Sequence, residues 1–523
     1  MSSILTNTSS MVALQTLKGI NKDLTMIQSE ISTGKSVGSA ADNAAIWAIS
    51  KVMESDVQGF KGISESLSLG ESTVAVARNA SETVSTLLTE VKGKIVAAQE
   101  DGVDRAKIQT DIVALRDQIN SVVGAAQFNG QNLVNNFDSV SVLSSLDRDA
   151  SGGVSSSSIS FTGTALTSEA GTVDTASALD RIGTVADDGT YTVGVGETLS
   201  NAGNDATLTL ATDLANNDTL TLNFGTEQFT FTNNTGSTIA VGDLANTVAA
   251  GISNLGVDGV TTSVSGAEVT VTSENAFDTI DIDGASGGST TVVVDPDAGG
   301  AQAALAAGAT GTLVARAETV SLGGAGNTGG VVNEGDGFRI ALGGQAFDYT
   351  AKDGDTLNEV AEGLKRVIDA GGINGVSVKV TASNDPTQSP PTLQIDNANA
   401  STITMTVDDG SGGTASGALV GLDGIDVSTK DGAQNALDNI ESLIGESIDA
   451  AAAFGSVQGR IEIQSEFIGK LTDSLKAGIG SLVDADMEEA SARLQALQVQ
   501  QQLGVQSLSI ANQAPQSILS LFR

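Results

Sequence analysis

The chain has 523 residues, enough for about three or four domains of ordinary size, and 63 acidic against 25 basic residues give it a formal net charge of −38. It contains no cysteine and no histidine, which excludes disulfides, thiolate or imidazole catalysis, Ser-His-Asp hydrolysis and histidine-ligated zinc. The acidic balance argues against nucleic acid or anionic lipid as partners. We therefore expect no enzyme and no cofactor.

Metal binding and membrane insertion are not expected either. Asp281 with Asp283 and Asp353 with Asp355 could bind Ca²⁺, but their spacing does not match an EF-hand loop, so turn residues are the favoured interpretation. The N-terminus lacks a basic stretch followed by an apolar one, so we expect no standard secretory signal peptide. No window of about 18 uninterrupted apolar residues predicts a membrane-spanning helix.

The first 140 residues or so have the spacing of helices. From Ala13 to Ile31 the apolar positions alternate steps of four and three, which keeps one apolar stripe on one helix face. A polar break follows at 32–39. Later helices are expected through 44–60, around 84–95, and from 108 to 122, before the Asn-Gly turn at 129–130.

The last hundred residues repeat this spacing, and helix returns at about residue 431. A helix cannot bury an apolar stripe alone, so each end of the chain needs a helical partner, and we expect the two ends to pair. The stripe positions are Leu17, Ile20, Leu24, Ile27 and Ile31 at the N-terminal end, and Leu494, Leu497, Val499 and Leu503 at the C-terminal end.

Between the helical ends the period of the apolar pattern changes to two. Leu220, Leu222 and Phe224 alternate with polar residues, and a similar run follows Gly225, which predicts a β-hairpin. The region from 143 to 430 is therefore expected to be a β-rich insertion in a helical rod.

This hairpin is repeated about 118 residues later. The run 218–225 aligns with 336–343, and a following helix aligns after a shift of about two residues. We expect two copies of a β-β-α-β-β unit, near 216–286 and 334–407. The predicted fold class is α+β and multidomain, with an N- and C-terminal helical coiled-coil rod and a large β-rich central insertion.

Four segments resemble bacterial flagellin. Residues 32–45 are similar to the pattern Ser-Ser-Gly-x-x-x-x-Ser-Ala-x-Asp-Asp-Ala-Ala, and residues 127–130 match Gln-Phe-Asn-Gly. Residues 455–460 resemble Gly-Ala-Val-Gln-Asn-Arg, and 511–523 resemble Ala-Asn-Gln-x-Pro-Gln-x-Val-Leu-Ser-Leu-Leu-Arg. The chain is identified by these motifs, in this order, as resembling flagellin over roughly its first 140 and last 95 residues.

The resemblance implies a structural subunit that self-assembles, head to tail, into the helical flagellar filament used for swimming. It implies an extracellular protein, exported through the flagellar channel, whose partners are many copies of itself, the export apparatus and chaperone, and the junction and cap proteins. No nucleic acid or membrane partner is implied.

The resemblance also assigns roles to segments and residues. It implies filament-core helices at 1–45 and 483–523, rod helices at 46–142 and 431–482, and a variable, surface-exposed insertion at 143–430. The residues expected to drive self-assembly are Leu17, Ile20, Leu24, Ile27, Ile31, Leu494, Leu497, Leu503, Ile518, Leu519, Leu521 and Phe522.

Other functions compete with the filament subunit. A hook–filament junction protein shares the helical ends, but it usually matches the C-terminal motif less well. A zinc peptidase in the insertion needs a His-Glu-x-x-His helix, which a chain without histidine cannot form. A carboxylate glycosidase is disfavoured because aromatic residues are only 3% of the chain. An adhesive role of the insertion stays open as a secondary function.

One segment departs from flagellins that activate the flagellin-sensing Toll-like receptor. Those carry Leu-Gln-Arg-Val-Arg-Glu-Leu where this chain has residues 88–94. The receptor-contacting arginine corresponds to Glu90, a charge reversal, and Gly93 weakens the helix by about 1 kcal/mol relative to alanine. The alternative is that Glu90 is simply an exposed helix residue. We expect weak receptor activation.

Overall fold

The computed structural model describes residues 7–148, 153–185, 191–193, 196–286, 292–295, 303–305, 310–323, 330–385 and 389–521. The chain forms two compact units. The first comprises Met1–Ala75, Ser139–Thr162 and Phe454–Arg523, and the second comprises Val76–Asp138 and Gly163–Ala453.

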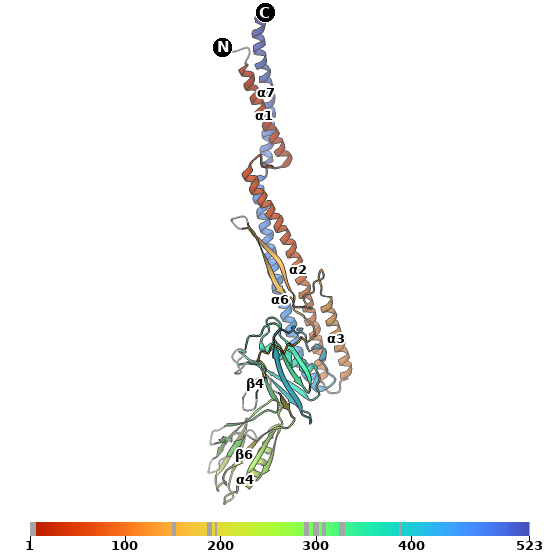
Figure 1. The fold of residues 1–523 in the computed structure, drawn as a ribbon, viewed down its shortest axis with the longest axis vertical. Helices are drawn as coiled ribbons and strands as arrows, with labels where there is room; N and C mark the ends of the chain where they lie inside the picture. The colour runs from red at the N-terminus through yellow and green to blue at the C-terminus, as the bar shows by residue number, and fades with distance from the viewer. Residues whose placement is uncertain are drawn as a thin grey trace. The chain divides into compact units, whose positions relative to one another are not determined.

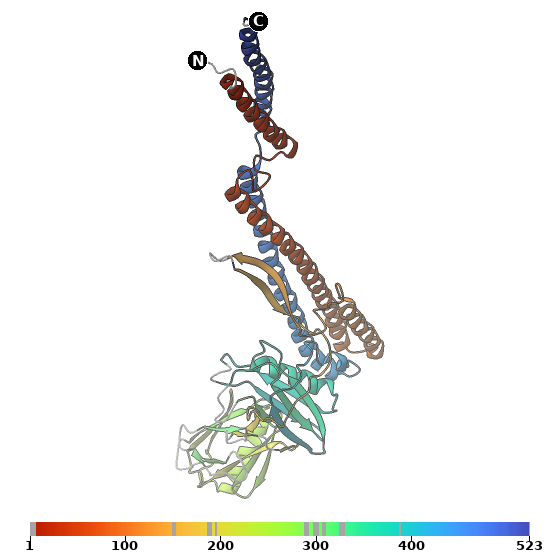
Figure 2. The same ribbon diagram turned by 45° about the horizontal axis from the view of Figure 1, so that its top comes forward.

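The first unit contains the two ends of the chain, which pair as expected. Helix α1 (Thr8–Thr33) lies beside helix α7 (Met487–Leu521), with the start of α1 next to the end of α7 (Figures 1 and 2). Helix α2 (Ala44–Gln99) begins in this unit, and helix α6 (Lys430–Val483) ends in it.

Helix α2 is one continuous helix of 56 residues, so the expectation of separate helices at 44–60 and 84–95 is wrong. Its buried stripe continues between these segments at steps of three and four residues, through Ile63, Leu67, Gly70, Val74, Ala77 and Ser81. Three of these six positions, Gly70, Ala77 and Ser81, are small, so the apolar signal in the sequence is interrupted although the helix face is continuous.

The polar break after α1 lies beside the break between α6 and α7. Helix α1 ends at Gly34, whose φ of 69° is a left-handed conformation that glycine adopts without steric cost. The Ser36 amide donates a hydrogen bond to the Val483 carbonyl at 2.7 Å, and the Ala485 amide donates to the Gly34 carbonyl at 3.0 Å. The break between α1 and α2 and the break between α6 and α7 therefore lie side by side.

A hairpin of β1 (Ser139–Arg148) and β2 (Val154–Thr162) packs on α2 within the first unit. The expected insertion boundary at residue 143 divides this hairpin, whereas the structure keeps 139–162 with the helices. Contact with α2 is close at Gly70, where an added Cβ would lie 2.6 Å from a methyl group of Val142.

Replacing Gly70 by alanine is expected to loosen the hairpin. Overpacking costs about 1–3 kcal/mol, which exceeds the gain of about 1 kcal/mol that alanine brings to a helix interior. The matched control is Gly62→Ala on the same helix, where an added Cβ meets no atom within 4 Å, so stability should rise. Hydrogen exchange of amides 139–162 checks this, and equal protection in both variants would contradict it.

The second unit contains helix α3 (Arg105–Ala125), the short 3₁₀ helix η1 (Leu422–Gly424) and the β-rich insertion. The elements of the insertion are β3 (Gly183–Val185), β4 (Tyr191–Val193), β5 (Glu197–Leu199), β6 (Asn204–Leu210), β7 (Thr219–Phe224), β8 (Glu227–Thr232), α4 (Val241–Leu255), β9 (Val260–Ser265), β10 (Glu268–Ser273), β11 (Ile280–Ser286), β12 (Val292–Asp295), β13 (Ala303–Leu305), β14 (Thr310–Leu313), β15 (Glu318–Ser321), β16 (Gly337–Leu342), β17 (Gln345–Thr350), α5 (Leu357–Ala370), β18 (Val376–Thr381), β19 (Thr392–Asn397) and β20 (Ile403–Gly410).

The two predicted repeats are present, and the sequence alignment matches the element bounds. Strands β7 and β8 correspond to β16 and β17, helix α4 corresponds to α5, and β9 corresponds to β18. Each copy then continues through two further strands, β10 and β11 or β19 and β20, which is one strand more than the hairpin–helix–hairpin pattern predicts.

The copies differ in how the chain connects their strands. In one copy the sheets have the orders β17-β16-β20-β5 and β18-β19-β15-β3-β4, and in the other the matching orders are β8-β7-β11-β14 and β9-β10-β6-β12-β13. Strands β3 to β5 precede the rest of their copy, whereas their counterparts β12 to β14 follow the rest of theirs. The copy formed by residues 204–313 is therefore a circular permutation of the other and is inserted between β5 and β15. We call it the inserted copy and the other the host copy.

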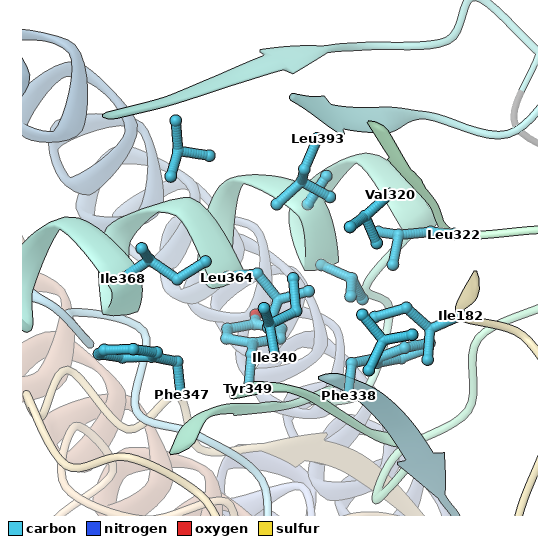
Figure 3. Packing of buried hydrophobic residues seen from close by; sticks show 14 of the residues in the cluster. Ile182, Val320, Leu322, Phe338, Ile340, Phe347, Tyr349, Leu364, Ile368 and Leu393 are labelled. Carbon is cyan, nitrogen blue, oxygen red and sulfur yellow. The ribbon is translucent and has the colours of Figure 1, made fainter. Parts of the chain in front are cut away.

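Each copy has its own apolar core. In the host copy, Leu364 and Ile368 of α5 face Phe347, Tyr349 and Ile340 from the sheet (Figure 3). The inserted copy builds a separate core from α4 and strands that include β6, β7 and β10. Two cores indicate two modules that bury apolar surface independently.

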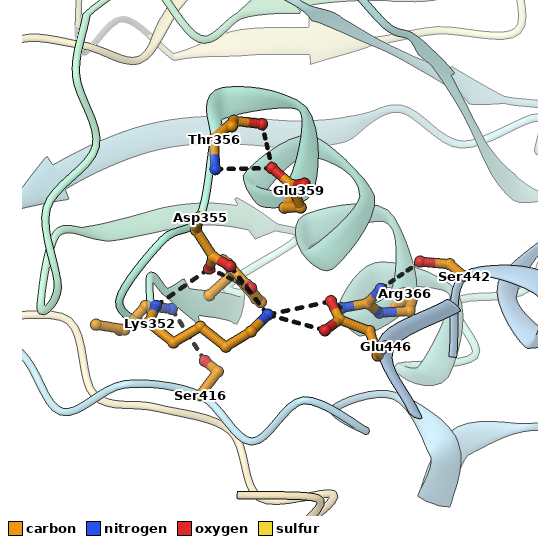
Figure 4. Close-up of polar contacts among 10 residues, drawn as sticks. Lys352, Asp355, Thr356, Glu359, Arg366, Ser416, Ser442 and Glu446 are labelled. Carbon is orange, nitrogen blue, oxygen red and sulfur yellow. Dashed lines mark hydrogen bonds and ion pairs between the residues drawn. The ribbon is translucent and has the colours of Figure 1, made fainter. Parts of the chain in front are cut away.

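Buried charges join α5 of the host copy to the first part of α6. The Lys352 ammonium lies 2.9 Å from Asp355 Oδ1 and 3.0 Å from Glu446 Oε2 (Figure 4). Tyr349 Oη donates a hydrogen bond to Asp355 Oδ2 at 2.8 Å. Arg366, which is 1% exposed, donates to Ser442 Oγ and lies 3.8 Å from Glu446. We call this set, with Lys365, Asp369 and Asn439, the α5–α6 ionic network.

This network predicts loss of stability at alkaline pH. Burial raises the pKa of Tyr349 well above 10.0, and the Asp355 carboxylate adds to this. For Lys352, burial alone would lower the pKa, but Glu446 and Asp355 outweigh it, so the pKa lies above 10.5. Because the folded chain holds protons that the unfolded chain releases, this contribution is complete below about pH 10 and is lost as the pH rises through the raised values.

The chain has two tyrosines, so in the Tyr191→Phe variant the tyrosinate absorbance comes from Tyr349 alone. We expect its tyrosinate absorbance to appear only together with unfolding of the host copy above about pH 10. Titration near the ordinary tyrosine pKa in a still folded protein would contradict the buried phenol.

Candidate assembly surface

The pair of α1 and α7 is antiparallel and is fixed by polar contacts along its length. Near one end, Asn7 Nδ2 donates to the Ala511 carbonyl at 2.9 Å, and about four turns further along α1, Gln501 Nε2 donates to Asn21 Oδ1 at 2.7 Å. Between them the helices approach at Gly504, where an added Cβ would lie 3.2 Å from Leu17.

The N-terminal residues expected to drive assembly lie on the face of α1 toward α7. Ile27 is buried at 4% exposure, and the others are half-buried. Those half-buried residues are Leu17, Ile20, Leu24 and Ile31. The predicted stripe therefore lies on the face of α1 that closely approaches α7 at Gly504.

On α7 the facing positions differ from the predicted stripe. Leu494 and Leu497 are half-buried, but Val499 and Leu503 are 56% and 55% exposed and lie off the contact face. The face continues instead through Gln501, Gly504 and Leu508, at steps of three and four residues. The sequence did not reveal it, because a glutamine and a glycine carry no apolar signal.

The remaining predicted residues are at the end of α7. The backbone of Ile518, Leu519 and Leu521 is helical, but their side chains lie outside the described residues, as does Phe522 entirely. Their part in assembly stays a prediction.

Exposed apolar side chains concentrate in the first unit. Among the large apolar side chains that are exposed in the described part of the chain, all but Val96, Val331 and Ile448 belong to this unit. Ile463 and Phe467, one turn apart on α6, are 71% and 56% exposed. Soluble monomers rarely leave such surface uncovered, so it indicates contacts with further chains.

Over the described ranges, no group of three or more acidic side chains is placed so that it could hold a metal ion. Within the same ranges, no helix has the length and hydropathy needed to cross a bilayer.

The receptor-related positions lie on α2 within the second unit. Glu90 and Gly93 are exposed, and open space surrounds the position of an added Cβ at Gly93. Between them, Lys92 forms an ion pair with Glu441 of α6.

Long helices whose apolar faces remain uncovered in the single chain define a self-assembling structural subunit. Comparison with known proteins agrees. The family description "Bacterial flagellin N-terminal helical region" matches residues 4–138, and "Bacterial flagellin C-terminal helical region" matches residues 437–522.

Relatives match the chain over its full length. Flagellin A of Rhizobium meliloti is 31% identical, and Flagellin A of its strain 1021 is 32% identical, with 100% of both chains covered in each case. Flagellin FljK of Caulobacter vibrioides is 37% identical over 35% of this chain and 69% of its own. A crystal structure of FlgL from Xanthomonas campestris matches 82% of this chain and 98% of that one, at 12% identity and a TM-score of 0.27.

The chain belongs to the bacterial flagellin family. It is a structural subunit of the flagellar filament, which many copies build outside the cell, and no comparison favours the junction-protein alternative.

Proposed function

We propose that the α1–α7 pair forms the inner layer of the filament, with the long helices α2 and α6 in the layer around it and the β-rich insertion outside. In this arrangement 1–45 and 483–523 are core segments, and 46–142 and 431–482 are rod segments. The observation that carries the proposal is the concentration of uncovered apolar side chains in the first unit. The insertion exposes few such side chains among its described residues, which suits contact with water.

Assembly then joins different patches of neighbouring copies. The outward residue Leu503 and the pair Ile463 and Phe467 are surfaces for a second copy, whereas Ile27 acts within the α1–α7 pair. Contacts between unlike patches do not close into a ring, so they build an open helical filament.

We further propose export as an unfolded chain through the flagellar channel, with the chaperone, junction and cap proteins as partners. The absence of cysteine favours this route, because no disulfide can form that would oppose unfolding.

Electron microscopy of the purified chain with filament seeds tests the assembly proposal. The comparison is a chain that lacks residues 1–30 and 494–523. Long filaments from the full chain and none from the truncated chain are expected. Short stubs that never elongate from the full chain would indicate a junction component, and equal polymerisation of both chains would exclude the terminal helices as the drivers.

Weak activation of the flagellin-sensing Toll-like receptor remains a prediction, based on Glu90 and Gly93. A reporter-cell assay of purified monomer should show a low response, and Glu90→Arg should raise it, because the variant restores the charge of the resembling motif. Exchange of the nearby exposed residue Thr89 for serine is the control and should change nothing. Potent signalling by the parent chain would contradict the prediction.

A further inference from the structure

The face of α5 directed at α6 carries buried charges. The Lys365 ammonium lies 2.8 Å from Asp369 Oδ2 and 3.0 Å from Asn439 Oδ1 of α6, and Asn439 Nδ2 donates to the same Asp369 oxygen at 2.9 Å. Together with Arg366, these groups form directional contacts that depend on the placement of α6. Burying ions is costly, so such groups are weak evidence for net stability, and in some proteins they instead select a single arrangement.

The inserted copy provides an internal comparison. The helix alignment places Ala249, Ala250 and Ser253 of α4 where the host copy has Lys365, Arg366 and Asp369. Phe231 stands in place of Tyr349, and the loop 233–240, which corresponds to the loop of Lys352 and Asp355, contains no charged residue. Every ionic group that the host copy contributes is therefore absent from its counterpart.

The inserted copy nevertheless has the same elements and its own core. Its helix α4 buries one apolar face, formed by Leu244, Val248 and Ile252 with two alanines, while Ala250 and Ser253 are exposed. In α5 the corresponding positions are buried as well, with Lys365 in the place of the buried Ala249, and Arg366 is buried where α4 has the exposed Ala250. The module thus folds without these charges. The host copy differs because a second face of its helix, the face of α5 directed at α6, is also covered.

The chain after β20 also returns to this second face. Gly421 has a φ of 93°, and an added Cβ there would lie 2.9 Å from Arg366 Cβ. At Gly424 an added Cβ would lie 2.3 Å from Ala370. The segment that leads into α6 therefore passes directly against α5, at positions where any larger residue would collide with it.

We infer that Lys352, Lys365 and Arg366 form a docking surface that is specific for Asn439, Ser442 and Glu446 of α6 and holds the host copy in one orientation on this helix. The partner it fits is a helix that presents a carboxylate and two neutral hydrogen-bonding side chains on one face. The inserted copy, which lacks the charges, folds but has no such surface.

The test exchanges host residues for those of the inserted copy, as Lys365→Ala with Arg366→Ala. The chain has no native cysteine, so Gln345→Cys and Gln434→Cys, both at exposed positions, allow two spin labels on the host copy and α6. Pulsed electron double resonance on the full chain should give one narrow distance distribution for the parent and a broad one for the variant. Hydrogen exchange of β16 and β20 should stay protected in both.

A second variant places the change on the partner helix. Asn439→Ala with Ser442→Ala and Glu446→Gln leaves the core of the host copy untouched and should broaden the distribution in the same way. Lys430→Ala, an exposed lysine of α6 outside the network, is the control and should keep it narrow. A narrow distribution in both sets of variants would overturn the inference. So would loss of β16 and β20 protection with Lys365→Ala and Arg366→Ala, because the charges would then serve folding and not docking.

Discussion

Replacing Ile27 by aspartate is expected to abolish filament formation at concentrations at which the parent chain polymerises. Ile27 is the buried residue of α1, at 4% exposure, and faces α7. An unpaired carboxylate there must either stay ionised without a partner or take up a proton, and both cost several kcal/mol. Because about 1.4 kcal/mol is a tenfold change in an equilibrium constant, the critical concentration should rise by more than about 100-fold.

Sedimentation of seeded polymer over a range of concentrations measures this effect. Thr25→Asp is the matched control, since it adds the same charge two residues away at an exposed position of the same helix. Its critical concentration should stay within about tenfold of the parent, the range of a surface charge. Equal loss of polymer in both variants would mean that charge near α1 opposes assembly in general, and that the α1–α7 contact is not the cause.

The sequence predicted α1 better than α7 for a physical reason. The contact face of α1 can be recognised in the sequence because its residues are apolar, namely Leu17, Ile20, Leu24 and Ile27. The matching face of α7 passes through Gln501 and Gly504, where a polar side chain and a bare backbone let the helices approach closely. The same effect hid the continuity of α2 at its small residues.

The repeat could be predicted, but its permutation could not. Strands β7 and β16 carry the same apolar alternation, and this local pattern survives in both copies. Which strand completes each sheet depends on pairing between distant segments, such as β20 with β5, and the Gly-, Ser- and Thr-rich connecting segments carry no signal for it. The sequence around Lys352 and Arg366 likewise gives no sign that these charges are buried, because the helix that covers them begins about 60 to 80 residues later.

The insertion of one copy into the other predicts unequal consequences for two matched substitutions. Leu222 of β7 and Ile340 of β16 occupy the same position in their copies, and both are 0% exposed. Truncation of either to alanine should cost its own copy about 2–5 kcal/mol. The effect on the stability of the copy without the substitution should differ between the two variants.

The inserted copy holds the two ends of its segment together, since Asn204 Nδ2 donates to the Ala315 carbonyl at 2.6 Å. While it is folded, the two parts of the host copy are already close, and β15 can pair with β3. Once it unfolds, the host copy must close a loop of about 110 residues, which costs roughly 4 kcal/mol. The host copy imposes no such condition on the inserted copy, whose ends can point freely into solvent.

Hydrogen exchange at increasing urea, followed separately in β7 and β16, resolves the two copies. Leu222→Ala should lower the midpoint of β7 and, after β7 has lost protection, that of β16 as well. Ile340→Ala should lower the midpoint of β16 and leave β7 at the parent value. Equal shifts of the midpoints of both strands in both variants would contradict this prediction. The two copies would then unfold as one cooperative unit although their cores are separate. The asymmetry follows from connectivity alone, because the two substitutions remove similar side chains from equivalent sites.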